Sequence, residues 1–447
     1  MSEKKHMFSN RELVRLILPL MVEQTLVTLV GMADSVIVSS VGEAAVSAVS
    51  LIDSVNILLF NIFTALATGG AIIAGQFLGQ KSEEEARHTG EQVLQFIVAV
   101  ALGIVIVMYL SKGFLLTHLF GTIEADVMRY ADTYLSIVLL GLPFLAFYTA
   151  GAALFRVVGD SGTSMKISLM MNLVNVSGNL FLIYGMHRGV EGVAIPTALS
   201  YAFAASLVFW KLHSPKMPIG LRRGWKPGFN KRLIRRICYV GVPNGIENSM
   251  FQLGKLILVS VVATFGTSSI AANAVSNAIS NFGIIGGMSI NLAVVTVVSR
   301  CVGAGDFEQA RYYTRKLFRC VIAAQTVING VIALLLPVFI QLYHLSAETG
   351  ELVTKIVLMH CFFACWLWAF SFTLPNTLRA SSDAKYTMLV GVSSMWLCRL
   401  CLGYVFAVIL DFGVIGIWMA MMCDWAVRSI FFVVRYLGGK WERMAIG

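Results

Sequence analysis

The sequence has few charged side chains for its length of 447 residues. Asp, Glu, Lys and Arg make up 13% of it, roughly half of the share that is usual in soluble domains, whereas 57% of the residues are hydrophobic. So little charge cannot cover the surface of soluble domains of this size, and apolar runs longer than about 18 residues are typical of membrane-spanning helices. These features exclude a secreted disulfide scaffold, a disordered regulator and a typical soluble enzyme.

Motifs for redox, metal and nucleotide chemistry are also missing. No cysteine precedes Cys238, and Cys398 and Cys401 form a C-x-x-C inside an apolar run, where we favour helix packing over a redox or metal site. The histidines show no metal-ligand spacing, and the pairs Gly254–Lys255 and Gly439–Lys440 lack the other residues of a phosphate-binding loop. We therefore expect no enzyme activity, no cofactor and no metal ion other than Na⁺ as a coupling ion. Energy for any transport must come from an ion gradient or from the substrate.

Apolar runs bounded by turn residues and charge clusters predict twelve helices. They cover residues 14–38, 46–78, 93–117, 131–155, 164–186, 192–212, 238–264, 270–300, 318–343, 352–378, 386–410 and 414–436. With the N-terminus in the cytoplasm, the inner segments hold 27 Lys and Arg residues and the outer segments hold four. This is the positive-inside asymmetry. We expect both termini in the cytoplasm, and we do not expect the positive net charge to bind nucleic acid.

The chain contains an internal repeat. A shift of 224 residues places Pro19, Glu23, Gly42, Gly79, Ala86, Gly189 and Gly192 on residues of the same type, and a shift of 223 does the same for Arg156 and Asp160. Six spans in each repeat, an even number, give both repeats the same orientation in the membrane. We expect an N-terminal six-helix lobe (1–212), a basic cytoplasmic linker (213–236) and a pseudo-symmetric C-terminal six-helix lobe (237–447).

Polar residues interrupt the apolar spans, where ionisable side chains usually pair, face a cavity or carry function. Corresponding polar stripes in the two repeats favour a hydrated substrate cavity, and hydrogen bonding between helices is the alternative. The residues predicted to line this cavity are Glu23, Asp53, Glu247, Asn273, Asn277 and Asn281. Asp424 and Arg428 have the i, i+4 spacing of an ion pair, and Asp160 is expected to cap the helix that follows it. Arg399 has no partner nearby in the sequence.

Asp34 is the most informative single residue, because it is a carboxylate within the first predicted span. Together with amide and hydroxyl oxygens it could bind a hard cation such as Na⁺, or it could take up and release a proton. Both are ways of coupling transport to an ion gradient. The alternative is a carboxylate near the outer interface that bonds to a neighbour.

Several sequence motifs resemble those of the multidrug and toxic compound extrusion (MATE) family, and the resemblance covers essentially the whole chain. GMADSVIVSSVGEAAVSAVS from Gly31 resembles the end of the family's first helix and the turn that follows it. GQFLGQKSEEEA and SRCVGAGDFEQA resemble a cytoplasmic turn that occurs once in each repeat, as do FRVVGDSGTSM and LRASSDAKYTM. NLVNVSGNLFLIYG is similar to the family's fifth helix.

The resemblance implies two lobes that form a V and alternate between inward and outward openings. It implies export of amphipathic, often cationic, compounds by antiport with Na⁺ or H⁺. Asp34 matches the coupling carboxylate, Asn175 and Asn179 match facing positions of the fifth helix, and Thr197 matches a hydroxyl ligand of the sixth helix. One branch of the family carries a second-lobe glutamate where this chain has Phe251, so we assign coupling to the first lobe.

Together these observations predict a cation-coupled multidrug antiporter of a bacterial cytoplasmic membrane. We expect a monomer whose partners are small-molecule drugs or organic cations and the lipid bilayer. A lipid or lipid-linked saccharide flippase of the same superfamily is the first alternative. Such flippases commonly have additional spans and more basic residues lining their lobes, so twelve spans and few cationic residues facing the expected cavity favour drug export. A receptor or channel is disfavoured by the repeat with internal carboxylates, and a membrane enzyme is disfavoured by the lack of a catalytic constellation.

Overall fold

The computed structural model describes residues 6–116, 124–214, 217–221 and 228–444, which are helical almost throughout. The helices are α1 (Asn10–Ser39), α2 (Glu43–Gly79), α3 (Glu83–Phe114), α4 (Ala125–Val157), α5 (Ser161–Leu180), α6 (Glu191–Leu212), α7 (Lys231–Ala263), α8 (Thr267–Gly303), α9 (Phe307–Leu342), α10 (Ala347–Ala364), α11 (Leu374–Ala380), α12 (Ala384–Ser394), α13 (Leu402–Tyr404), α14 (Gly413–Leu437) and α15 (Lys440–Met444). Within these described ranges, eleven helical stretches are long and apolar enough to cross a membrane. A twelfth span is broken, because Ala347–Ala364 and Ala369–Ala380 are bent by 63° at a short gap. The all-α membrane fold predicted from the sequence is confirmed.

The chain divides into two compact units. One, called here the N-terminal unit, is Val14–Gly245, and the other, the C-terminal unit, joins the described part of Met1–Leu13 to Ile246–Gly447. The division falls inside α7, whereas the sequence suggested a boundary in the basic segment 213–236. Of that segment, residues 215–216 and 222–227 lie outside the described residues, as do residues 1–5.

The end of the basic segment is held by α3. The Gln92 side chain donates to the carbonyl of Gly228 at 2.7 Å and accepts from the backbone N–H of Asn230 at 2.8 Å. These two hydrogen bonds extend the N-terminal unit through the start of α7.

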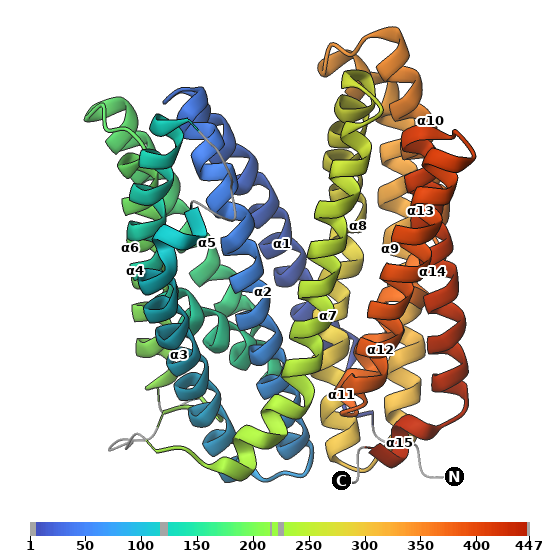
Figure 1. Ribbon diagram of the computed structural model, residues 1–447. Helices are drawn as coiled ribbons and strands as arrows, with labels where there is room; N and C mark the ends of the chain where they lie inside the picture. Colours follow the sequence, from blue (N-terminus) through green and yellow to red (C-terminus); the bar gives the residue numbers. More distant parts are fainter. Residues whose placement is uncertain (1–5, 117–123, 215–216, 222–227, 445–447) are drawn as a thin grey trace. The chain divides into compact units, whose positions relative to one another are not determined.

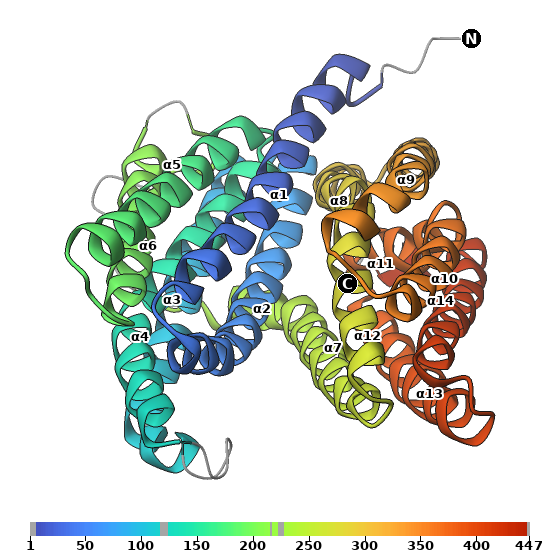
Figure 2. The same cartoon turned by 90° about the horizontal axis from the view of Figure 1, so that it is seen from above.

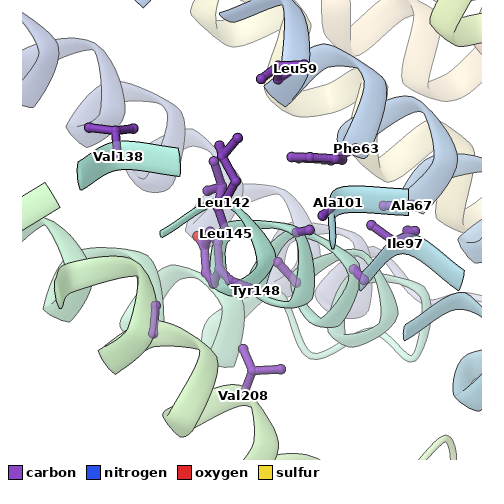
Figure 3. Close-up of a cluster of buried hydrophobic side chains, with 14 of the residues drawn as sticks. Leu59, Phe63, Ala67, Ile97, Ala101, Val138, Leu142, Leu145, Tyr148 and Val208 are labelled. Carbon is purple, nitrogen blue, oxygen red and sulfur yellow. The ribbon is translucent and has the colours of Figure 1, made fainter. Parts of the chain in front are cut away.

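The core of the N-terminal unit is built around α4, which packs against α2, α3 and α6 (Figures 1 and 2). Figure 3 shows Phe63 of α2, Ile97 of α3 and Leu142 of α4 within one apolar cluster. Each of these three side chains is fully buried. Burial of this kind contributes about 25 cal/mol per Å² of apolar surface removed from water.

A glycine pair brings α2 and the first half of α7 into backbone contact. A Cβ atom added to Gly69 would lie 2.7 Å from the Gly241 nitrogen and 2.8 Å from the Ile237 carbonyl oxygen. Such contacts are to backbone, which cannot rotate away. This close approach explains why the start of α7 belongs to the N-terminal unit.

We expect Gly69→Ala to destabilise the N-terminal unit by about 1–3 kcal/mol, the usual cost of overpacking a filled core. Gly103→Ala on α3 is the matched control, since nothing lies within 4 Å of its added Cβ. The measurement is the thermal unfolding midpoint of the purified protein in detergent. Equal midpoints for the two variants would show that the α2–α7 contact is not tight.

In the C-terminal unit, α8 packs against α9 and α10, and α14 packs against the π-helices η4 (Met395–Cys401) and η5 (Val405–Ile409). The N-terminal segment also belongs to this unit. The backbone N–H of Phe8 donates to the Tyr313 hydroxyl, which donates to the Phe8 carbonyl, both at 2.7 Å.

π-helices locate the one-residue difference between the repeats. The π-helix η2 (Phe181–Gly185) and η5 lie 224 residues apart, whereas Asp160 and Asp383 lie 223 apart. Between those two points the second repeat contains η4, while the corresponding part of α5 is regular α-helix. The extra residue of the second repeat is therefore accommodated by the wide turn of η4.

Candidate functional site

A chain of hydrogen bonds joins four polar residues of the N-terminal unit. Asn179 of α5 donates through Nδ2 to Asp34 Oδ1 of α1 at 2.9 Å and to Asn175 Oδ1 at 3.3 Å. Asn175 Nδ2 donates to Thr197 Oγ1 of α6 at 3.1 Å, and the Thr197 hydroxyl donates to the Val193 carbonyl at 2.8 Å. The structure thus brings together the four residues that the sequence assigned to ion coupling. Their role in coupling stays a prediction.

Local packing explains how α5 and α6 come close enough for these bonds. Asn175 and Asn179 are one helical turn apart and therefore share a face of α5. Between them in the chain, a Cβ added to Gly178 would lie 2.7 Å from Pro196 Cβ. Glycine at this position lets α6 approach, so that Thr197 reaches Asn175.

The cluster offers the oxygen chemistry that a hard cation requires. It combines the Asp34 carboxylate with the amide oxygens of Asn175 and Asn179 and the hydroxyl of Thr197. Asn179 is fully buried, and among the described residues its Oδ1 has no hydrogen-bond partner. An unsatisfied buried oxygen is costly, so a cation or a protonated group next to it would be stabilised.

Asp53 of α2 lies within electrostatic reach of Asp34. It is held by Tyr134 of α4, whose hydroxyl donates to Asp53 Oδ1 at 3.3 Å. Tyr134 was not predictable from the sequence, because no spacing along the chain relates it to Asp53. Asp53 therefore lies near the Asp34 cluster, and its place in a substrate cavity stays a prediction.

Glu23 and Glu247 form buried ion pairs. Glu23 Oε1 lies 3.4 Å from Arg156 Nη1, and Ser164 donates to Glu23 Oε2 at 3.0 Å. Its repeat mate Glu247 binds Arg379 Nη2 at 2.7 Å and Arg428 Nη2 at 3.2 Å. These contacts compensate the charge of both glutamates without a substrate. That Glu23 and Glu247 line a substrate cavity stays a prediction.

The repeat itself carried a signal for these pairs, because Glu23 and Arg156 both recur in the second half of the chain. The prediction of an ion pair between Asp424 and Arg428 is wrong. Arg428 instead pairs with Glu247, and Asp424 accepts a hydrogen bond from Ser394. The expected cap is confirmed, since Asp160 Oδ1 accepts from the Thr163 N–H at 3.2 Å.

The asparagine stripe of α8 is divided. Asn273 and Asn277 line a cavity in the C-terminal unit, where Asn277 Nδ2 donates to Asn273 Oδ1 at 3.2 Å and Trp418 Nε1 donates to the same oxygen at 3.1 Å. Asn281 is exposed and does not line this cavity. In the part of the chain that the structure describes, no group of three or more His, Cys, Asp or Glu side chains could hold a metal ion.

The family is decided by a match that occurs twice. The MatE family model matches residues 19–181 and residues 243–405. The chain belongs to the MATE family. The two matches begin 224 residues apart, which is the shift of the internal repeat.

Relatives of this MATE protein match it almost from end to end. It is 24% identical to the probable multidrug resistance protein NorM of Thermotoga maritima, over 98% of this chain and 94% of that protein. It is 26% identical to the uncharacterized transporter YisQ of Bacillus subtilis, over 95% of this chain and 93% of that protein. An outward-facing multidrug resistance MATE transporter superposes with a TM-score of 0.88 at 20% identity, over 97% and 95% of the two chains. The chain therefore has the fold of this family and is a multi-span membrane transporter.

Proposed function

We propose that this protein exports amphipathic or cationic compounds by antiport with Na⁺ or H⁺, through alternating access of its two lobes. The observation that carries the proposal is the Asp34–Asn179–Asn175–Thr197 cluster. It joins α1 to α5 and α6 through a carboxylate inside a membrane span, where an uncompensated charge is expensive.

Charge compensation at Asp34 explains how an ion would drive the cycle. Binding of Na⁺ or a proton neutralises the carboxylate, which changes the strength of the hydrogen bond that Asn179 donates to it. Because Asp34 lies on α1 and Asn179 lies on α5, this change alters how α1 packs on its neighbours. A two-state packing of these helices, biased by the ion, couples the gradient to opening of the substrate path.

Transport driven by imposed gradients tests this function. Purified protein in liposomes would be given rhodamine B ethyl ester, a permanently cationic dye, with a Na⁺ gradient in one series and a pH gradient in another. Dye movement driven by one gradient and collapsed by dissipating it is expected, and it would name the coupling ion. No movement under either gradient, with folded protein, would sink the antiport proposal and favour the lipid or lipid-linked saccharide flippase.

We also propose that the protein resides in a bacterial cytoplasmic membrane as a monomer with both termini inside. The support for this orientation is the concentration of Lys and Arg in the segments assigned to the inner side. The segment between α6 and α7 and the N-terminal segment then share the cytoplasmic side. Labelling of single introduced cysteines in sealed vesicles with an impermeant maleimide checks this orientation.

A further inference from the structure

A cavity of about 160 Å³ lies inside the C-terminal unit. Its walls come from α7, α8, η4 and α14, and six of the side chains that line it are Lys255, Leu258, Asn273, Asn277, Arg399 and Met421. The coupling cluster described above contains no member of this set.

This cavity is the repeat counterpart of the Asp34 cluster. The 224-residue shift carries Asp34 to Leu258, Asp53 to Asn277, Asn175 to Arg399 and Thr197 to Met421, and all four of these C-terminal residues line the cavity. The geometry also corresponds, because Arg399 Nη2 lies 2.7 Å from Met421 Sδ, as Asn175 Nδ2 contacts Thr197 Oγ1. The two repeats therefore place polar sites at equivalent positions.

The charge of the two sites is opposite. In the second repeat, Leu258 stands in place of Asp34, and Asn277 stands in place of Asp53. Lys255 stands in place of Gly31. With Arg399 the second site has two cations and no carboxylate among the lining residues. Asp424 interacts electrostatically with Arg399, but one carboxylate against two cations leaves the site positive.

Arg399 is poorly satisfied by the protein around it. It is 9% exposed, and its Nε is buried with no hydrogen-bond partner among the described residues. Its other contacts are a thioether sulfur, which is a weak acceptor, and the Phe251 ring, whose centroid lies 5.0 Å away. The Lys255 ammonium nitrogen lies over the same ring, 5.2 Å from its centroid. Asp424 acts on Arg399 only at a distance, since no carboxylate of the described residues forms a salt bridge with the guanidinium. A buried guanidinium without an anion in direct contact is costly, so binding of an anion here would be favourable.

The π-helix η4 presents this guanidinium. Arg399 lies within Met395–Cys401, the segment that contains the extra residue of the second repeat. π-bulges occur frequently at functional sites, since the wide turn redirects side chains. The insertion and the charge reversal thus occur at the same place.

We propose that this cavity binds an anionic group, such as a carboxylate, sulfonate or phosphate, of an amphipathic molecule. This inference rests on the proposed function, and it adds acids and zwitterions to the compounds that the transporter accepts. The volume suits one anionic group with a short apolar attachment, because pockets for whole drug-sized ligands are about 300–1,000 Å³. The remainder of the molecule would extend beyond the cavity.

A pair of dyes with one shared cationic ring system, one with a free carboxylate and one with that carboxylate converted to an ethyl ester, tests the proposal. Rhodamine B carries a free carboxylate, whereas rhodamine B ethyl ester has the same cationic ring system without it. Binding to the purified full-length protein in detergent would be measured by fluorescence anisotropy. We expect the acid to bind about 10-fold or more tightly than the ester, which corresponds to one charge-assisted hydrogen bond.

Variants locate the preference in the cavity. Lys255→Met and Arg399→Gln are expected to remove the preference for the acid and leave ester binding unchanged, while Arg399→Lys retains part of it. Lys355→Met, which removes a cation paired with Glu351 outside the cavity, is the matched control and should keep the full preference. If Arg399→Gln does not fold, the acid and ester affinities of Lys255→Met test the proposal by themselves. Equal binding of acid and ester by the unaltered protein, or equal losses for both dyes in Lys255→Met, would overturn the proposal.

Competition identifies the source of the anion and separates this inference from the antiport proposal. Displacement of rhodamine B by phosphatidylglycerol supports a lipid headgroup as occupant, and displacement by inorganic phosphate alone supports a small soluble anion. Binding is measured without a gradient. Export of the ester without a preference for the acid would therefore reject the anion site and retain antiport, whereas the opposite pair of results would retain the anion site and reject antiport.

Discussion

Replacing Asp34 with Asn is expected to reduce gradient-driven export to the level of protein-free liposomes. The amide oxygen of the new side chain can still accept the hydrogen bond that Asn179 donates at 2.9 Å, so the fold should be retained. An amide, however, neither carries the charge that holds a cation nor takes up a proton at neutral pH. The measurement is dye export under the gradient that drives the unaltered protein.

Asp126→Asn is the matched control for this prediction. Asp126 lies in the first turn of α4, where it pairs with Arg129 at 3.5 Å and is largely exposed. The same chemical change there should leave export unchanged. Dye binding without a gradient should persist in Asp34→Asn, which separates a coupling defect from loss of the substrate site. Full export by Asp34→Asn would show that coupling lies elsewhere.

Glu247→Gln is expected to give the largest loss of stability, about 3 kcal/mol. The carboxylate of Glu247 compensates two buried guanidinium groups, Arg379 at 2.7 Å and Arg428 at 3.2 Å. A neutral amide of the same size leaves both positive charges buried, and removing one partner of a buried ion pair typically costs about 3–5 kcal/mol. The thermal unfolding midpoint in detergent should therefore fall by several degrees.

Two glutamates provide the comparison. Glu351→Gln removes an exposed i, i+4 partner of Lys355, which should leave the unfolding midpoint almost unchanged, because exposed ion pairs contribute little to stability. Glu23→Gln should lie between the two, because Glu23 compensates only Arg156 and does so at 3.4 Å. A midpoint for Glu247→Gln equal to that of Glu351→Gln would be incompatible with a stabilising role for the buried cluster.

The sequence determined the elements of this fold because apolar length and repeat spacing are local properties of the chain. Twelve apolar runs predicted the spans, and the broken span Ala347–Ala364 with Ala369–Ala380 was predicted as the continuous range 352–378. The bend was not predictable, because it lies between Ala364 and Ala369, where no proline, glycine or charged residue interrupts the apolar run. The close approach of α2 to the start of α7 was not predictable either, because Gly69 and Gly241 lie far apart in the chain and nothing in the sequence pairs them.

Helical spacing tells which residues share a face, and that was enough to group Asn175 with Asn179 on α5. It cannot tell which helix lies opposite, because that depends on the packing of all the helices in the unit. Arg428 illustrates the difference: the spacing pointed to Asp424 four residues away, whereas the partner is Glu247, 181 residues away in the chain. The sequence by itself determined the membrane-spanning class and the duplication, and its resemblance to the MATE family pointed to the residues of the Asp34 cluster. Only the tertiary structure decided the ion pairs and the cationic cavity, since both require side chains from helices far apart in the chain.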